Sequence, residues 1–277
     1  MSKIIAIDAG HGSNTAGKRT FDGYREHWIN VRCSYFFEKA LKRCGFKTIR
    51  SGWDDTNSKD DPDPSITSRQ NAIRAAGVDA VVSWHANHSG GTTWDSAAGV
   101  ETFIHVTASK RQDSEKLAKL IQAELIKGTA QKNRGVKTGN FGMCNATYMK
   151  CYAAVLLEIG FMSNKLESGY MKTDAFCREQ AEDACRGLCK YYGYKYVPES
   201  SSTSAAPAAT KYRVTTNGAR LALREAAGTS SDLIRYVPNG TVVSGTGKSQ
   251  TVKAVKWLQV KVDGKTGWMH SGYLKKQ

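Results

Sequence analysis

The chain has 277 residues, of which 40% are hydrophobic, and a formal net charge of +15 at pH 7. This length suffices for one enzyme domain plus a small second module, and the composition excludes a disordered protein. No apolar stretch approaches the roughly 18 to 20 residues that cross a bilayer, so membrane insertion is excluded too. Residues 1–5 lead directly into an apolar run rather than a signal peptide, which predicts cytoplasmic synthesis.

In chain order, short apolar runs alternate with segments of helical periodicity. The apolar runs predict strands at residues 3–7, 46–50, 78–84, 100–104 and 153–157. Helical spacing of apolar residues predicts helices near residues 29–44, 66–76, 113–125 and 174–192. This alternation predicts an α/β domain with a twisted mixed sheet of about six strands flanked by helices.

Four side chains typical of a hydrolytic zinc site accompany these predicted strands. His11, His85 and Glu158 each follow a strand, and Glu26 comes shortly before the first helix. Because ligands of open α/β sheets bind beyond the carboxyl ends of the strands, we expect these groups to converge. Two imidazoles and one carboxylate leave a coordination position open, which predicts a metallohydrolase with Zn²⁺ as its cofactor.

The proposed metal donors have alternative roles. His11 alone could be a turn histidine bonded to the backbone. Glu26 could be a carboxylate favoured by the first helical turn, with the adjacent His27 as the ligand instead. His88 could replace His85 as a ligand, although a loop position suits it better.

Four motifs occur in a fixed order in this part of the chain. They are Asp8-Ala9-Gly10-His11-Gly12, Glu26 followed by Asn30, Ser83-Trp84-His85-Ala86-Asn87, and Glu158-Ile159-Gly160-Phe161-Met162-Ser163-Asn164. Together they resemble the zinc-dependent N-acetylmuramoyl-L-alanine amidases of the Amidase 3 type over roughly residues 1–194. The resemblance implies cleavage of the amide between N-acetylmuramic acid and L-alanine in peptidoglycan. It also implies that His11, Glu26 and His85 bind zinc and that Glu158 is the catalytic carboxylate.

Glu158 suits proton transfer in such a reaction. Zinc lowers the pKa of a bound water to about 7 and polarises the amide carbonyl. A nearby carboxylate then passes a proton to the departing nitrogen, because amines leave poorly unless they are protonated. The alternative is an isolated buried acid paired with a cation, although burying a charge without a function is costly.

Five further residues are candidates for orienting ligands or contacting the substrate. Asp8 and Asn30 are predicted to orient the metal ligands by hydrogen bonds, although Asp8 could simply close a turn. Asn87 is predicted to face the substrate. Arg134 and Lys137 belong to a Gly-rich, basic segment that either lines the cleft for stem-peptide carboxylates or is a flexible loop.

Seven cysteines are present, an odd number without paired C-x-x-C spacing. Cys177, Cys185 and Cys189 fall on the apolar side of the last predicted helix of the first domain. We therefore expect buried free thiols rather than disulfides, with a single reactive thiol such as Cys144 as an alternative.

A segment without apolar periodicity separates two modules. Residues 197–210 are rich in Ser, Ala and Pro, which predicts a flexible linker between a catalytic domain (1–196) and a second domain (211–277). The second domain holds 12 Lys and Arg against three acids, so that +9 of the net charge lies there. Its short strand candidates, separated by turn residues, predict a small all-β module.

The motifs of this module occur in a recognisable order. They are Leu221-Ala222-Leu223-Arg224-Glu225, Trp257-Leu258-Gln259-Val260, Gly264-Lys265-Thr266-Gly267-Trp268-Met269 and Tyr273-Leu274. They resemble the bacterial SH3-like wall-binding domains, although Ala222 replaces the usual Asn and Glu225 begins a departure from the usual Ser-Gly-Pro. The resemblance implies an SH3-like barrel, in which Trp257, Trp268 and Tyr273 are candidate wall-binding residues. The two tryptophans could instead be core residues.

Peptidoglycan is the expected partner, and anionic wall polymers are a further one because the second domain is basic. A basic barrel could also bind nucleic acid, but no interleaved aromatic platform is apparent, so we expect no nucleic-acid partner. The whole pattern predicts a phage or prophage endolysin of a Gram-positive host, released by a separate holin to act at the cell wall. A bacterial autolysin or spore-release amidase is the near alternative, and a non-catalytic wall-binding protein is the alternative from another class.

Overall fold

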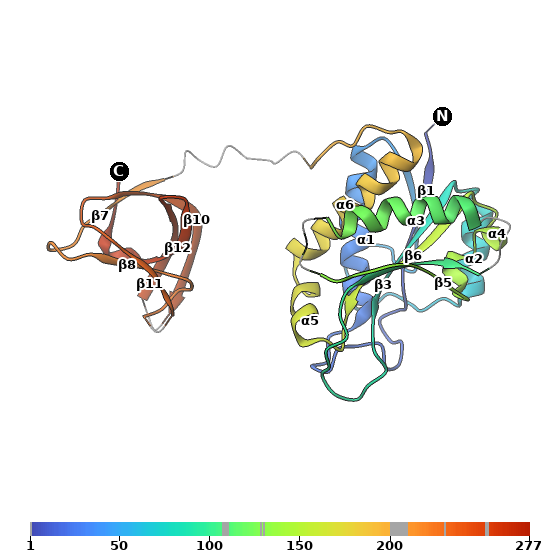
Figure 1. The fold of residues 1–277 in the computed structure, drawn as a ribbon, viewed down its shortest axis with the longest axis horizontal. Coiled ribbons are helices and arrows are strands. Elements are labelled where there is room, and N and C mark those ends of the chain that lie inside the picture. The colour runs from blue at the N-terminus through green and yellow to red at the C-terminus, as the bar shows by residue number, and fades with distance from the viewer. Residues whose placement is uncertain are drawn as a thin grey trace. The chain divides into compact units, whose positions relative to one another are not determined.

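The computed structural model describes residues 2–106, 111–127, 129, 131–199, 210–229, 231–252 and 255–277. The chain divides into two compact units, residues 1–199 and residues 200–277. Figure 1 shows the elements of each unit, which are described separately below. In the described residues no helix is long and apolar enough to span a membrane.

The described part of the first unit is built on a six-stranded mixed sheet with the strand order β2-β1-β3-β6-β4-β5. The strands are β1 (Ile4–Ala9), β2 (Lys47–Ser51), β3 (Ala80–Asn87), β4 (Val100–His105), β5 (Asn133–Gly139) and β6 (Ala153–Phe161). Neighbours run parallel except for β4 and β6, which are antiparallel. The predicted mixed sheet is confirmed, and its order makes β1, β3 and β6 neighbours.

Helices cover both faces of this sheet. They are α1 (Glu26–Arg43), α2 (Ile66–Ala75), α3 (Arg111–Leu125), α4 (Ala146–Met149), α5 (Lys165–Met171) and α6 (Asp174–Tyr192). Successive strand side chains point to opposite faces. Ile5 and Ile7 therefore join the larger core with α1, α3 and α6, whereas Ala6 joins a smaller core with α2 and α4. Figure 1 shows α2 and α4 beside each other and apart from α6.

Local signals explain the helix boundaries. Ser65 caps α2 by accepting a hydrogen bond from the Ser68 N–H, and Thr173 caps α6 in the same way from Phe176. Gly193 ends α6 in the left-handed conformation that favours glycine. The four predicted helices are confirmed, while α5 and the short α4 are additional.

The Gly-rich segment 134–145, for which the sequence left a cleft lining and a flexible loop as alternatives, is partly a strand. Its first part belongs to β5, which pairs in parallel with β4 at the edge of the sheet. An edge strand has only one strand neighbour, so it needs fewer apolar side chains, and the strand pattern is weak here. The remainder contains a short 3-10 helix, η2 (Gly142–Cys144).

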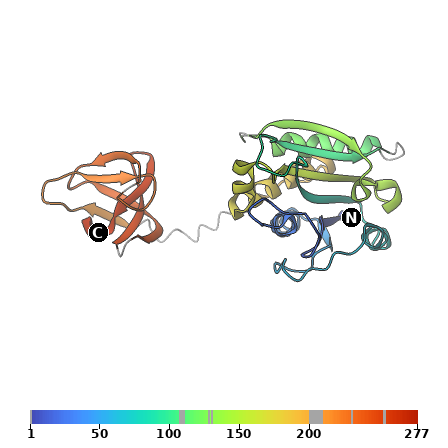
Figure 2. The same cartoon turned by 90° about the horizontal axis from the view of Figure 1, so that it is seen from below.

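The described part of the second unit is an antiparallel sheet with the order β13-β7-β10-β11-β12-β8-β9. Its strands are β7 (Lys211–Val214), β8 (Leu221–Arg224), β9 (Leu233–Val237), β10 (Val242–Val252), β11 (Val255–Val262), β12 (Lys265–His270) and β13 (Leu274–Lys276), with a 3-10 turn η3 (Ser271–Tyr273) before the last. The sheet curls into an SH3-like half-barrel (Figure 2). The side chains inside it form a small apolar core. The predicted all-β module is confirmed.

Candidate active site

Three of the predicted metal donors meet at the carboxyl ends of β1 and β3. His11, Glu26 and His85 each offer a ligand atom within 4.8 Å of the others. Glu26 Oε2 lies 3.2 Å from His11 Nε2, and its Oε1 lies 3.1 Å from His85 Nδ1. Burial raises the pKa of Glu26, but the hydrogen bonds from both histidines outweigh burial and bring the pKa below its usual value. The site thus holds an ionised carboxylate between two imidazoles.

The backbone brings these donors together over long separations in sequence. His85 belongs to β3 and Glu26 begins α1, whereas His11 lies in the turn after β1 with a φ of 64°. A left-handed conformation costs a non-glycine residue roughly 1–3 kcal/mol and persists only where surrounding contacts hold it. The preceding Gly10 allows His85 to approach, because a Cβ there would lie 2.2 Å from His85 Cε1.

Gly10→Ala is therefore expected to displace the His85 ring and weaken zinc binding by roughly 10- to 100-fold, the usual range for a disturbed ligand environment. Competition with a zinc chelator would measure the affinity. Gly169→Ala in α5 is the matched control, because nothing lies within 4 Å of the added Cβ. Equal zinc affinities in the two variants would contradict the expected displacement.

Glu158 lies directly beside this donor group. It is the register partner of His85 on the neighbouring strand and of Glu101 on the other side. Its Oε2 is buried and finds no hydrogen-bond partner among the described residues. Burial raises the pKa of Glu158 well above its usual value, and the carboxylates of Glu26 and Glu101 raise it further. An unsatisfied acid beside three donor groups fits a centre that receives a cation.

Glu101 is a buried acid that the sequence analysis did not single out. It accepts hydrogen bonds from Asn87 Nδ2 at 2.6 Å and Arg134 Nε at 2.6 Å, and pairs with the Lys137 ammonium. Burial raises its pKa, but Lys137 and Arg134 outweigh burial and lower the pKa overall. Asn87, Arg134 and Lys137, which were predicted to contact the substrate, thus bind Glu101. An acid inside the apolar run Val100–Ile104 is the feature of the sequence that could have indicated this role.

The alternative ligand His27 is turned away from the donor group. Its Nδ1 lies 2.9 Å from the Gly10 carbonyl oxygen and its Nε2 lies 2.9 Å from Asp61 Oδ2. Asn30 Nδ2 donates to the same Gly10 oxygen at 3.1 Å. Asn30 thus holds the turn that carries His11, and Asp61, the partner of His27, is itself buried.

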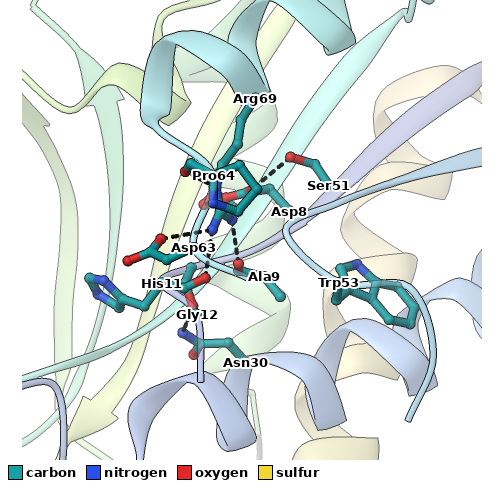
Figure 3. A network of polar contacts seen from close by, with 12 residues as sticks. Asp8, Ala9, His11, Gly12, Asn30, Ser51, Trp53, Asp63, Pro64 and Arg69 are labelled. Atoms are coloured by element: carbon teal, nitrogen blue, oxygen red, sulfur yellow. Dashed lines mark hydrogen bonds and ion pairs between the residues drawn. The ribbon is translucent and has the colours of Figure 1, made fainter. Parts of the chain in front are cut away.

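Asp8 acts through a residue that sequence reasoning missed, the buried Arg69 of α2. Asp8 accepts hydrogen bonds from Ser51, Ser83 and Arg69 Nη1, the last at 3.0 Å. The Arg69 guanidinium also donates to the carbonyl oxygens of Ala9 at 2.7 Å and His11 at 2.6 Å. Figure 3 shows this guanidinium reaching from α2 into the turn after β1. It ties the left-handed turn to the sheet.

The donors open into a cleft of about 850 Å³. Its wall combines charged groups with apolar ones, including Lys18, Asp63, Ile66, Asn87, His88, Phe141 and Met162. His88 lines the cleft outside the three-residue donor group, where its Nδ1 accepts a hydrogen bond from Gly90. A cleft of this size lies within the usual range of ligand-binding sites.

A mixed α/β sheet with a histidine–carboxylate–histidine group, an adjacent unsatisfied acid and an open cleft defines a metal-dependent hydrolase. The family described as N-acetylmuramoyl-L-alanine amidase matches residues 5–190. The chain belongs to this zinc-dependent family, and it is a peptidoglycan hydrolase that cleaves the bond between N-acetylmuramic acid and L-alanine.

Similar proteins agree with this assignment. The N-acetylmuramoyl-L-alanine amidase CwlM of Bacillus licheniformis is 27% identical over 69% of this chain and 69% of its own. The endolysin of Bacillus phage SPP1 is 28% identical over 70% of this chain and 68% of its own. The catalytic domain of the amidase CwlV from Bacillus (Paenibacillus) polymyxa var. colistinus is 26% identical, with a TM-score of 0.59 over 70% of this chain and 99% of that one. Residues 219–275 match the bacterial SH3 domain family.

Proposed function

We propose that His11, Glu26 and His85 bind the zinc ion of this amidase and that Glu158 is its catalytic carboxylate. The observation that supports this most directly is the convergence of three donors within 4.8 Å beside the unsatisfied Oε2 of Glu158. Asn30 and Asp8 hold the turn of His11, Asp8 through Arg69. The donor set of two imidazoles and one carboxylate is typical of zinc sites that keep a position for substrate.

Zinc, when bound, supplies Lewis-acid activation of the attacking water and of the amide carbonyl. The chain itself moves the proton. Glu158 Oε2 accepts it from the attacking water and donates it to the departing alanine nitrogen. A positive charge at the donor group offsets the repulsion from Glu26 and Glu101, so that Glu158 can ionise despite its burial. Asn87, Arg134 and Lys137 act mainly by holding Glu101 in place.

We further propose that the enzyme is a phage or prophage endolysin of a Gram-positive host, which reaches the wall through a holin. An amidase unit followed by a wall-binding SH3 unit, together with the similarity to a phage endolysin, supports this role. Similarity to the sporulation-specific amidase of Bacillus subtilis, 27% identical over 72% of each chain, favours a spore-release amidase as the second candidate.

Purified vegetative walls and spore-cortex fragments separate these roles. The endolysin proposal expects fast release of free L-alanine amino termini from vegetative walls, and mass spectrometry of the products would identify the cut bond. Intracellular expression should leave Gram-positive cells intact until the membrane is permeabilised, after which they lyse. A clear preference for cortex fragments would favour the spore-release role instead.

The second unit is proposed to bind anionic wall polymers. Within the described residues of this unit, the one ion pair joins Arg235 to Asp263. Most of its Lys and Arg side chains therefore have no acidic partner there. Tyr273 is exposed and its ring lies 5.0 Å from that of His270, which in turn lies 5.7 Å from the buried Trp257. Tyr273 is therefore the more accessible candidate for wall contact, whereas Trp257 lies in the interior.

Reversal of charge at Lys275 and Lys276 to Glu, both exposed on β13, is expected to weaken binding of the full chain to walls severalfold. The loss should shrink in high salt, because mobile ions screen exposed charges. Co-sedimentation with walls, before and after extraction of their anionic polymers, would measure it. The control is the same reversal at exposed Lys47 and Lys59 of the first unit. Identical losses in the two double variants would contradict a polymer-binding second unit.

A further inference from the structure

A second group of metal-type donors lies in the first unit, on the elements α1 and α6. Cys44 follows the last residue of α1, and Cys185 and Cys189 lie one turn apart on α6. Each offers its Sγ within 4.8 Å of the other two. Residues at i and i+4 share one face of a helix, so that α6 presents both of its thiols to the end of α1.

The spacing of these sulfur atoms suits a thiolate metal site. Cys44 Sγ and Cys185 Sγ lie 3.6 Å apart. Sulfur ligands that bind one tetrahedral zinc ion at about 2.3 Å lie roughly 3.8 Å from each other. Thiolates select soft ions such as Zn²⁺ and Cu⁺ over Mg²⁺ or Ca²⁺.

The surroundings of Cys44 also resemble those of a metal-bound thiolate. The Val197 N–H donates to Cys44 Sγ at 3.2 Å, while the Arg43 guanidinium donates to the Val197 carbonyl oxygen at 3.0 Å. Backbone N–H groups that donate to sulfur stabilise its negative charge. Cys44 is 8% exposed whereas Cys185 and Cys189 are fully buried, so an ion has access from the side of Cys44.

We propose that Cys44, Cys185 and Cys189 form a structural site for a thiophilic cation, Zn²⁺, separate from the catalytic centre. The bound ion joins the end of α1 to α6. Through Cys44 it also joins them to Val197, which lies close to the end of the first unit. Binding releases the thiol protons to solvent and involves no oxidant. Because Cys44 is far in sequence from Cys185 and Cys189, an ion that binds all three stabilises the folded unit against the unfolded chain. The inference does not depend on the roles proposed for His11, Glu26 or His85.

Metal content of the full chain, prepared with reductant and excess Zn²⁺ and then desalted, tests the proposal. The wild type is expected to hold two equivalents. His11→Ala should lose one of them together with activity, and Cys185→Ala should lose the other one. Cys177→Ala is the matched control, since this residue is equally buried on α6 but lies outside the group of three thiols.

Cadmium supplies a readout that the catalytic site does not share. Cd²⁺ added to His11→Ala is expected to produce ultraviolet cadmium-thiolate absorption and to raise the thermal midpoint, and both effects should vanish in His11→Ala/Cys185→Ala. Should Cys185→Ala fail to fold, alkylation of His11→Ala decides instead: Zn²⁺ should protect Cys44, Cys185 and Cys189 from N-ethylmaleimide. A single zinc equivalent that disappears with His11→Ala, absent protection, or a Cys44–Cys185 disulfide in place of bound metal would overturn the proposal.

Discussion

Glu158→Gln is expected to lower kcat by about 10²- to 10⁴-fold, the range that general acid–base catalysis usually contributes. Glutamine keeps the size and one oxygen of the side chain, but it can neither accept nor return a proton. Glu158 is not one of the three donors that meet within 4.8 Å, so zinc content should stay at the wild-type level. Release of L-alanine amino termini from purified walls would measure turnover, and atomic absorption would measure the metal.

His85→Ala provides the contrast for this variant. It removes one of the donors and is expected to lose both zinc and turnover. The stability of Glu158→Gln should equal or exceed that of the wild type, because a neutral amide replaces a buried acid. Burial disfavours the charged form of this acid and raises its pKa well above the usual value. Normal turnover in folded, zinc-loaded Glu158→Gln would refute the catalytic role of this carboxylate.

Three of the four site residues were predictable because each is marked locally. His11, His85 and Glu158 follow or end apolar runs, and the parallel arrangement of β1, β3 and β6 brings their carboxyl ends together. The order of the motifs then favoured Glu26 over His27. The structure supplies a physical reason for that choice, since His27 is held between Gly10 and Asp61.

The residues that support the site were harder to predict. Arg69 donates to carbonyl oxygens about sixty positions earlier in the chain. Every residue has a carbonyl oxygen, so the sequence does not indicate which ones accept these hydrogen bonds. Glu101 and Asp61 are buried acids whose partners become evident only when β4, β5 and α1 pack. The cluster of Cys44, Cys185 and Cys189 could not be predicted for the same reason. The periodicity of α6 predicts that its cysteines are buried, but not which residues they contact.

Loss of the Arg69 guanidinium is expected to destabilise the catalytic unit more than loss of any surface ion pair. In Arg69→Met the carboxylate of Asp8, which is fully buried, keeps only the hydroxyl donors Ser51 and Ser83. Removal of one partner from a buried pair costs about 3–5 kcal/mol. For a unit of this size the thermal midpoint should then fall by roughly 6–20 °C. The turn of His11 also loses its hydrogen bond from Arg69, so zinc affinity should fall as well.

Thermal unfolding of the zinc-free chain, followed by circular dichroism, measures the loss of stability separately from the loss of zinc affinity. Arg43→Met is the matched control, because it removes a more exposed pair with Glu182 from the same unit, and its loss is expected to cost less. Arg69→Met/Asp8→Asn should recover part of the loss, since the amide leaves no uncompensated charge. Space for the guanidinium depends on Gly52, where a Cβ would lie 1.8 Å from Arg69 Nη1. An Arg69→Met midpoint equal to that of Arg43→Met would show that Asp8 and the His11 turn are held by other contacts.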